Sequence, residues 1–145
     1  MEVLVTGADT DLGRAIAAGF REAGHGVVIS GARRAELEVA AKELEVDYVV
    51  CDNTDPDALA AARSLFPHHL DTIVNVPAPR HDPGDPRTYT LAERRAAWHE
   101  ALDATVLAPV LTLQTPMSEY EPGTWGPRHS HTLIEPFGGW QSPKE

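Results

Sequence analysis

A glycine-bearing turn near the start of the sequence has the residue types that bind phosphate groups. Gly7 and Gly13 lie within Thr6-Gly7-Ala8-Asp9-Thr10-Asp11-Leu12-Gly13, which follows the apolar run Val3-Leu4-Val5. Gly7 permits a tight turn and Gly13 lets a following helix approach the strand, while the free N–H groups at the helix start favour a pyrophosphate. The segment therefore predicts a nucleotide site. The alternative is a tight strand-to-helix turn that binds nothing.

Polar side chains that follow later apolar runs extend this candidate site. Arg33 and Arg34 come shortly after Val27-Val28-Ile29. A guanidinium at that place can fork onto a 2′-phosphate, where an NAD enzyme has a carboxylate. We predict Arg33 as the main contact with NADP and Arg34 as its support; the alternative is two solvated residues in a first helical turn. Asp52 and Asn53 follow the next run, and Asp52 either contacts the ligand or leads a helix.

Apolar runs separated by amphipathic segments predict the elements that position these residues. The runs are short and rich in β-branched residues, as in strands buried on both faces of a parallel sheet. They are Val3-Leu4-Val5, Val27-Val28-Ile29, Tyr48-Val49-Val50 and Ile73-Val74-Asn75-Val76. Helical spacing separates them, with Gly24 after one helix and Asp55-Pro56 at the start of another. The pattern predicts an α/β fold, a partial Rossmann doubly wound parallel sheet with strand order 3-2-1-4 over residues 1–76.

The second half of the sequence changes character. Residues 77–90 contain four prolines and predict a loop, followed by a helix near Leu91 to Leu113 that Pro109 should kink or end early. Residues 116–145 hold five prolines and four glycines without clean periodicity, and no fifth strand is expected there. We therefore expect a truncated Rossmann-like dinucleotide-binding domain over residues 1–115 and an irregular tail over residues 116–145.

Composition excludes several classes of function. A formal net charge of −10 disfavours binding to nucleic acid or to an anionic membrane surface, since the arginines form no basic run. No basic leader or long apolar stretch precedes the first strand, so we expect a cytoplasmic protein. Cys51, in an apolar neighbourhood, is interpreted as a buried residue rather than a nucleophile. His129, His131 and Glu135 are interpreted as solvated side chains, so no metal is expected.

Four segments together resemble the short-chain dehydrogenase/reductase family over residues 1 to about 115. Thr6 to Gly13 is similar to its TGxxxGxG signature, and Ser30-Gly31-Ala32-Arg33-Arg34 to the arginine pair of its NADP-preferring members. Val50-Cys51-Asp52-Asn53 resembles the acidic residue that contacts adenine, and Val74-Asn75-Val76-Pro77-Ala78 the NNAG segment beside the cofactor. The resemblance implies NADP as cofactor. The residues expected to bind it are Gly7, Asp9, Thr10, Asp11, Leu12, Gly13, Arg33, Arg34, Asp52, Asn53 and Asn75.

The glycine turn departs from the family signature at two positions. Asp11 stands where the family has its middle glycine, and Asp9 stands where small hydroxyl residues are usual. Two carboxylates beside an anionic ligand should weaken its binding. The alternative is that either side chain caps the helix and points away from the ligand.

The resemblance does not extend to the catalytic residues of the family. Thr105 occupies the place of its catalytic asparagine, and no Tyr-x-x-x-Lys pair occurs in the printed sequence. In the family that lysine lowers the pKa of the tyrosine, which exchanges a proton with the substrate oxygen as hydride moves. No catalytic residue is therefore predicted. Residues 120–140 instead resemble the C-terminal end of bacterial glucose-6-phosphate dehydrogenases.

These observations leave three functions open. The first is an NADP-binding module or pseudoenzyme, the second an NADP-dependent oxidoreductase completed by another chain, and the third a truncated or rearranged product without activity. An unpaired fourth strand and an apolar stripe also predict a homo-oligomer or a partner chain. The stripe comprises Trp98, Leu102, Thr105, Val106, Val110 and Leu113.

Overall fold

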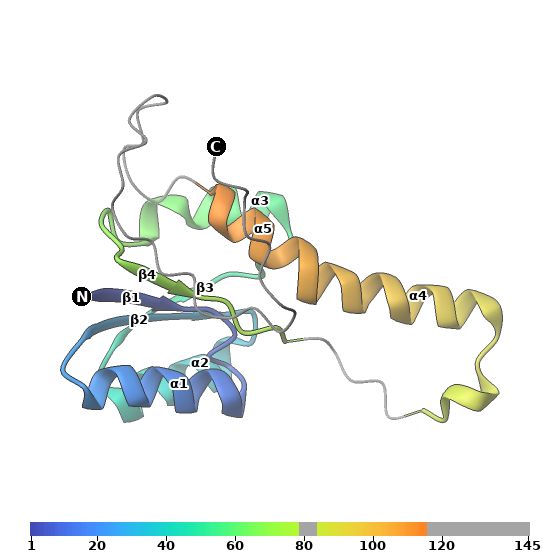
Figure 1. Cartoon of the computed structure of the whole chain (residues 1–145), viewed down its shortest axis with the longest axis horizontal. Coiled ribbons are helices and arrows are strands. Elements are labelled where there is room, and N and C mark those ends of the chain that lie inside the picture. Colours follow the sequence, from blue (N-terminus) through green and yellow to red (C-terminus); the bar gives the residue numbers. More distant parts are fainter. Residues whose placement is uncertain (79–83, 116–145) are drawn as a thin grey trace, which may run out of the picture.

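The computed structural model describes residues 1–78 and 84–115. Within them, parallel strands β1 (Glu2–Val5), β2 (Gly26–Gly31), β3 (Asp47–Val50) and β4 (Thr72–Val74) form a sheet in the order β3-β2-β1-β4 (Figure 1). The predicted fold class and strand order are confirmed. Strand β4 ends at Val74, two residues before the end of the apolar run Ile73-Val74-Asn75-Val76 that predicted it.

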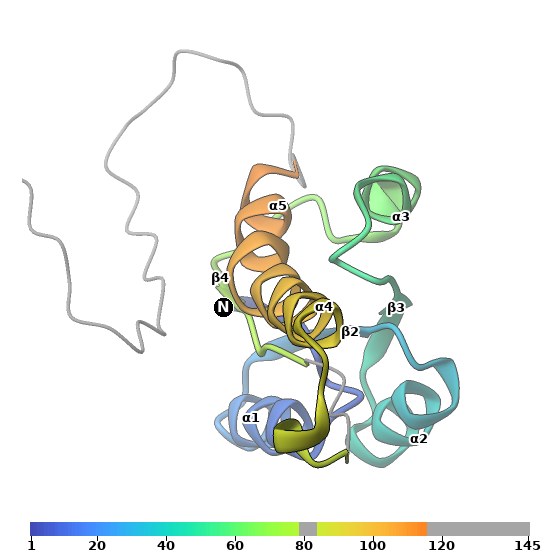
Figure 2. The same ribbon diagram turned by 90° about the vertical axis from the view of Figure 1, so that its right-hand side faces the viewer.

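Helices cover both faces of this sheet, as the uninterrupted apolar strands require. Helices α1 (Asp11–Glu22) and α2 (Arg34–Leu44) lie on one face, and α3 (Pro56–Ala62) and α5 (Ala108–Gln114) on the other (Figure 2). Successive side chains of a strand point to opposite faces, so Val3 and Val5 join the core under α1 and α2, whereas Leu4 joins the core under α3.

Local sequence explains where the helices begin and end. The Thr10 side chain accepts the Gly13 N–H at the start of α1, and Gly24 follows that helix with a φ of +84°, a conformation that favours glycine. Asp55 caps α3 by accepting the Asp57 N–H, and Pro56 is its first residue. The predictions of Gly24 after α1 and of Asp55-Pro56 at the start of α3 are confirmed.

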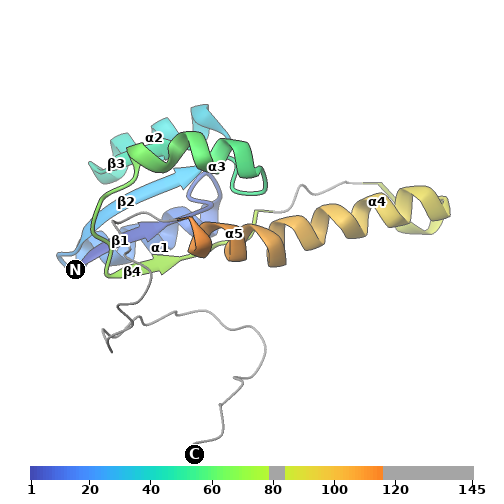
Figure 3. The same cartoon turned by 90° about the horizontal axis from the view of Figure 1, so that it is seen from above.

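The last helical segment continues through Pro109 rather than ending early. Helix α4 (Leu91–Leu102) passes into a π-helical turn, η3 (Asp103–Leu107), and then into α5 (Figure 3). Proline lacks an N–H group, so the backbone must rearrange where it interrupts the hydrogen-bond ladder. The wider turn does this directly before Pro109, where the Ala108 N–H donates to the Asp103 carbonyl. Two short 3-10 turns also occur, η1 (Arg63–Leu65) after α3 and η2 (Pro86–Thr88) before α4.

Candidate functional site

A hollow of about 980 Å³ opens at the carboxyl ends of the strands. Every strand contributes residues at or after its carboxyl end. They are Thr6, Gly7, Asp9 and Thr10 at β1, Ser30 to Arg33 at β2, Cys51 to Thr54 at β3, and Val76 and Ala78 at β4. The chain leaves β1 toward β2 on one side, and β4 lies on the other side. Such a reversal of strand order is where doubly wound sheets bind their ligands.

The glycine turn forms the floor of this hollow. Gly7 has a φ of +63°, and a Cβ atom there would collide with the Val76 carbonyl oxygen. A Cβ atom on Gly13 would collide with the Gly7 carbonyl oxygen, so α1 starts as close to the turn as two backbones allow. Thr10 Oγ1 donates to Gly7 O at 2.6 Å and accepts the Gly13 N–H at 3.2 Å. The turn thus has the form of a phosphate cradle.

The Thr6 hydroxyl ties this floor to β4. The Val76 N–H donates to Thr6 Oγ1 at 3.2 Å, and Thr6 Oγ1 lies 3.3 Å from Asn75 Oδ1. Thr6 is buried, so these bonds fix the end of β4 against the turn. Asn75, a predicted cofactor residue, contacts Thr6 and does not itself line the hollow.

Asp9 and Arg33 meet in the hollow although they lie 24 residues apart in the chain. The backbone N–H of Arg33 donates to Asp9 Oδ2 at 3.0 Å, and the Arg33 Nε donates to the same oxygen at 3.2 Å. Arg33 Nη2 also donates to the backbone carbonyl of Asp9, and Nη1 donates to Glu36 Oε1 at 3.4 Å. The helix cap of α1 is Thr10. The Asp9 side chain is not a helix cap, because Arg33 holds it.

Asp52 and Asn53 line the hollow where β3 ends. Asp52 Oδ1 accepts the Thr54 N–H at 3.0 Å and the Thr54 hydroxyl at 2.6 Å, which closes a local turn. The Asn53 amide donates to the buried Thr112 hydroxyl of α5 at 3.1 Å. Asn53 therefore anchors α5 beside the hollow.

The remaining predicted residues lie around the hollow rather than in its lining. Asp11 and Leu12 are exposed in the first turn of α1, and Gly13 is buried behind Gly7. Arg34 points to Glu38, with Nη1 3.4 Å from Oε1, and its side chain is 66% exposed. Of the predicted arginine pair, the structure brings Arg33 alone into the hollow.

Sequence reasoning missed part of the lining, including two acids from α4 and η3. Glu100 and Asp103 border the hollow together with Ser30, Cys51 and Ala104. A helical repeat of small buried residues, Ala104, Ala108 and Thr112, is the signal that identifies this face of the helix. The described lining residues include four acids, Asp9, Asp52, Glu100 and Asp103, and a single cation, Arg33.

Cys51 lies in the wall of the hollow as a buried thiol. Its pKa is raised to about 11, mainly by burial and to a smaller extent by the nearby charges of Asp52 and Asp55. A thiol with a raised pKa is a poor nucleophile. The interpretation of Cys51 as a buried, unreactive residue agrees with this environment.

Thr105, at the place of the family's catalytic asparagine, lies outside the lining. It is exposed, and its hydroxyl donates at 2.7 Å to the carbonyl of Ala101 in the preceding α4. The tail predictions, including His129, His131, Glu135 and the resemblance over residues 120–140, fall outside the described residues. The described ranges contain no cluster of three metal-ligating side chains and no helix long and apolar enough to cross a membrane.

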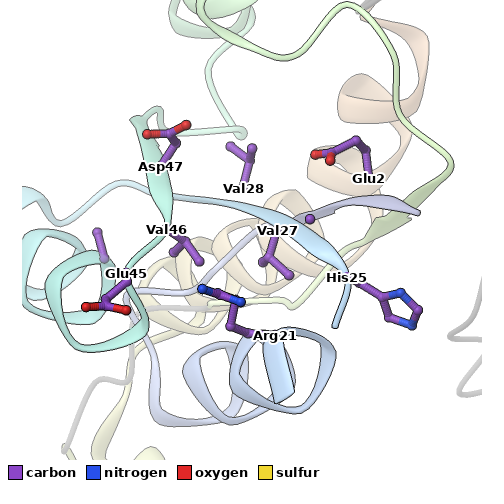
Figure 4. Close-up of a pocket in the computed structure, with 10 residues that line it drawn as sticks. Glu2, Arg21, His25, Val27, Val28, Glu45, Val46 and Asp47 are labelled. Atoms are coloured by element: carbon purple, nitrogen blue, oxygen red, sulfur yellow. The ribbon is translucent and has the colours of Figure 1, made fainter. Parts of the chain in front are cut away.

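A second hollow, of about 470 Å³, lies at the opposite, amino ends of the strands (Figure 4). Arg21, His25, Glu45 and Asp47 border it together with apolar residues of β2. Parallel sheets of this type place ligands at the carboxyl ends of the strands, so we assign the candidate site to the larger hollow.

Comparisons with known proteins agree with this fold. A model of the short chain dehydrogenase family matches residues 2–126. Two curated oxidoreductases of Mycobacterium tuberculosis, from strains CDC 1551/Oshkosh and H37Rv, are each 67% identical over 115 residues, or 79% of this chain and 52% of theirs. The chain therefore spans about half the length of the curated relatives it matches.

Two solved structures have the same fold. A short-chain type dehydrogenase/reductase from Mycobacterium ulcerans is 25% identical, with a TM-score of 0.65 over 79% of this chain and 44% of that one. Serine dehydrogenase in complex with NADP+ is 22% identical, with a TM-score of 0.67 over 80% of this chain and 47% of that one. Since the family model covers most of the sequence and its glycine turn forms the floor of the hollow, this chain belongs to the short chain dehydrogenase family.

Proposed function

We propose that this chain is a dinucleotide-binding module that binds NADP in the hollow at the carboxyl ends of β1 to β4. One observation carries the proposal: four strands deliver their following residues to a single hollow, whose floor is a glycine turn at the start of α1. Members of the family bind nicotinamide dinucleotides, and the backbone at Gly7 and Gly13 leaves the space that a pyrophosphate needs.

Particular residues would hold each part of the dinucleotide. The turn from Gly7 to Gly13 would hold the pyrophosphate, with N–H groups at the start of α1 as donors. Arg33 would take the 2′-phosphate of NADP, and Asp52 would lie near the adenine. When bound, NADP would supply a hydride donor or acceptor. Arg34, which pairs with Glu38 outside the lining, would act through long-range charge.

Dinucleotide binding without turnover is the form of the proposal that fits the printed residues. The sequence holds no Tyr-x-x-x-Lys pair, and Thr105 bonds to its own helix outside the hollow. A second candidate function is an NADP-dependent oxidoreductase that another chain completes. One observation favours it: the chain matches only about half the length of its oxidoreductase relatives. A truncated product without activity is the third.

The apolar stripe of α4, η3 and α5 supports a partner for this half-fold. Trp98, Leu102, Val106, Val110 and Leu113 are all exposed, Trp98 to 70%. Leaving such side chains in water forfeits about 1.5–3 kcal/mol each relative to burial. We propose that a second copy or another chain covers the stripe.

A cytoplasmic location, the domain boundary near residue 115 and the glucose-6-phosphate dehydrogenase-like tail stay predictions.

Titration with NADPH and with NADH tests the proposal. Intrinsic fluorescence or calorimetry of the full chain should give saturable binding, with NADPH the tighter of the two. The matched control is Gly7→Asp, which fills the turn against Val76 and adds a charge where the pyrophosphate would lie. If neither dinucleotide binds, or Gly7→Asp binds as well as the wild type, the assignment of the hollow is wrong.

A further inference from the structure

We infer that Asp9 reduces the preference of the hollow for NADP over NAD, because its carboxylate occupies the edge of the Arg33 guanidinium that a 2′-phosphate would need. The inference deepens the proposed function and rests on it. It concerns a carboxylate at a position where the family resemblance implies a small hydroxyl residue, and it follows from the contacts of that carboxylate.

The geometry of the guanidinium carries the first step. Arginine recognises a phosphate best through two parallel N–H groups on one edge of its planar head. On Arg33 the edge formed by Nε and Nη2 faces Asp9, with Nε donating to Oδ2 at 3.2 Å and Nη2 donating to the backbone carbonyl. The remaining nitrogen, Nη1, donates to Glu36 at 3.4 Å. A 2′-phosphate must therefore share or displace these partners.

The burial of Asp9 carries the second step. Its side chain is 3% exposed, whereas that of Arg33 is 54% exposed, so the carboxylate is fixed and the guanidinium is the member that can move. Asp9 also accepts the Arg33 backbone N–H at 3.0 Å, and its Oδ1 lies against Gly31, where a Cβ atom would come within 2.5 Å. The Asp9 carboxylate is therefore held in place, and a ligand that binds beside it meets a negative charge at a fixed position.

The unpaired oxygen of Asp9 indicates what the ligand should offer. Oδ1 is buried and has no hydrogen-bond donor among the described residues. A buried carboxylate oxygen without a donor is unfavourable, and a ligand hydroxyl would satisfy it once the exposed Arg33 side chain moved away from the carboxylate. A ribose 2′-hydroxyl, present in NAD, is such a donor, whereas the 2′-phosphate of NADP is an anion that the same oxygen repels. Asp9 thus favours NAD, whereas Arg33 favours NADP. Their ion pair therefore reduces the difference between the affinities for NADP and for NAD.

Charge-neutral substitution of Asp9 tests the inference. Asp9→Asn keeps an oxygen for the Arg33 N–H but removes the charge that holds the guanidinium. The dissociation constants of NADPH and NADH would be measured for the full chain, with 2′,5′-ADP and 5′-AMP as probes of the adenosine half. We expect Asp9→Asn to raise the affinity for NADPH and 2′,5′-ADP about tenfold or more, because the freed guanidinium gains a charge-assisted contact with the 2′-phosphate. The affinity for NADH and 5′-AMP should change less than about threefold.

Two further variants separate the ion pair from general electrostatics. Asp11→Asn removes a carboxylate from the same turn, but Asp11 is exposed and outside the lining, so it should change both dinucleotides by the same small factor. Asp9→Asn combined with Arg33→Ala should lose the gain in NADPH affinity, because the gain depends on the freed guanidinium. Thermal unfolding confirms that each variant folds, and Asp9→Ser replaces Asp9→Asn if the latter does not.

The outcomes distinguish this inference from the proposed function. If wild type and variants bind neither dinucleotide, the proposed function fails and this inference fails with it. If dinucleotides bind but Asp9→Asn leaves the ratio of NADPH to NADH affinity unchanged, lowers it, or gives a gain that persists without Arg33, the site stands and the role of Asp9 is wrong.

Discussion

Single residues in this chain are constrained by how closely two backbones approach each other. Gly13 and Gly19 lie in the same helix, α1, yet their surroundings differ completely. A Cβ atom on Gly13 would overlap the Gly7 carbonyl, whereas one on Gly19 would meet nothing within 4 Å. The glycine of the signature is thus required by packing against the turn, and the second glycine is a replaceable helix residue.

Alanine at these two positions should therefore have opposite effects on stability. Gly13→Ala should lower the free energy of unfolding by about 2–3 kcal/mol, since the turn and helix must move apart. Gly19→Ala should raise it by about 0.5–1 kcal/mol, because alanine is the better helix former. Urea unfolding measures both. Equal effects of the two substitutions would show that α1 does not pack on the turn as described.

Arg33 matters for stability as well as for the ligand. Arg33→Ala would leave the buried Asp9 carboxylate with one fewer charged donor, and we expect a loss of about 1–3 kcal/mol in unfolding free energy. NADPH affinity should fall by about 1–3 kcal/mol for the lost phosphate contact. Adding Asp9→Asn should restore stability without restoring affinity. If Arg33→Ala binds NADPH as the wild type does, Arg33 is not the NADP determinant.

Cys51 should be protected from alkylation in the folded chain. Its pKa is raised from 9.0 to about 11, so the thiol stays protonated in the native state. At pH 8 the thiolate fraction should be about 100-fold lower than in the unfolded chain, and iodoacetamide should react correspondingly slowly. Because the folded pKa is the higher one, the thiol's contribution to stability is complete below pH 9 and is lost as pH rises toward 11. Equal alkylation rates in buffer and in urea would contradict this.

At the scale of elements, the last helical segment divides its faces between the hollow and the solvent. Ala104, Ala108 and Thr112 are buried toward the sheet, and Glu100 and Asp103 border the hollow. The apolar stripe lies on the remaining surface, along a segment whose first part projects beyond the sheet (Figure 3). A surface helix that leaves large apolar side chains in water along its length is typical of an interface.

Charged residues in the stripe should therefore disrupt association. Val106→Glu combined with Val110→Glu should shift the sedimentation coefficient of the full chain toward that of a monomer, since a buried carboxylate disfavours an apolar contact. Val39→Glu is the matched control, because Val39 is a half-exposed valine on α2, away from the stripe. A wild-type chain that already sediments as a dispersed monomer would contradict the proposed covering of the stripe.

At the scale of the whole molecule, the described residues form the hollow in which we propose that a dinucleotide binds. All four strands contribute residues at or after their carboxyl ends, so the hollow is a property of the sheet rather than of one loop. The described lining of the hollow holds four acids and one cation, Arg33. Binding of an anionic ligand there would therefore depend on backbone N–H groups and on Arg33.

The isolated chain should accordingly bind NADPH without oxidising it. Absorbance at the reduced nicotinamide band, followed with a panel of carbonyl compounds, should show no turnover above buffer, since no tyrosine-lysine pair is present to supply the proton. Adding candidate partner chains tests the alternative of a completed oxidoreductase. Steady NADPH oxidation that tracks the purified chain and disappears in Gly7→Asp would contradict the binding-module proposal.

The sequence by itself determined the fold class, the strand order and the glycine turn of this protein. These features depend on local pattern: apolar runs such as Val3-Leu4-Val5, helical spacing between them, and residues such as Asp55-Pro56 that start a helix wherever they occur. The family resemblance followed from the same segments because each is contiguous in the chain.

The tertiary structure alone decided how the side chains around the hollow pair. Asp9 and Arg33 form their ion pair because the ends of β1 and β2 are neighbours, and nothing in either local segment indicates which way the carboxylate turns. Glu100 and Asp103 reach the same hollow only because α5 packs beside α3 and the π-helical turn before Pro109 sets the helix's phase. Pairing between distant segments depends on packing geometry, which local sequence pattern does not encode.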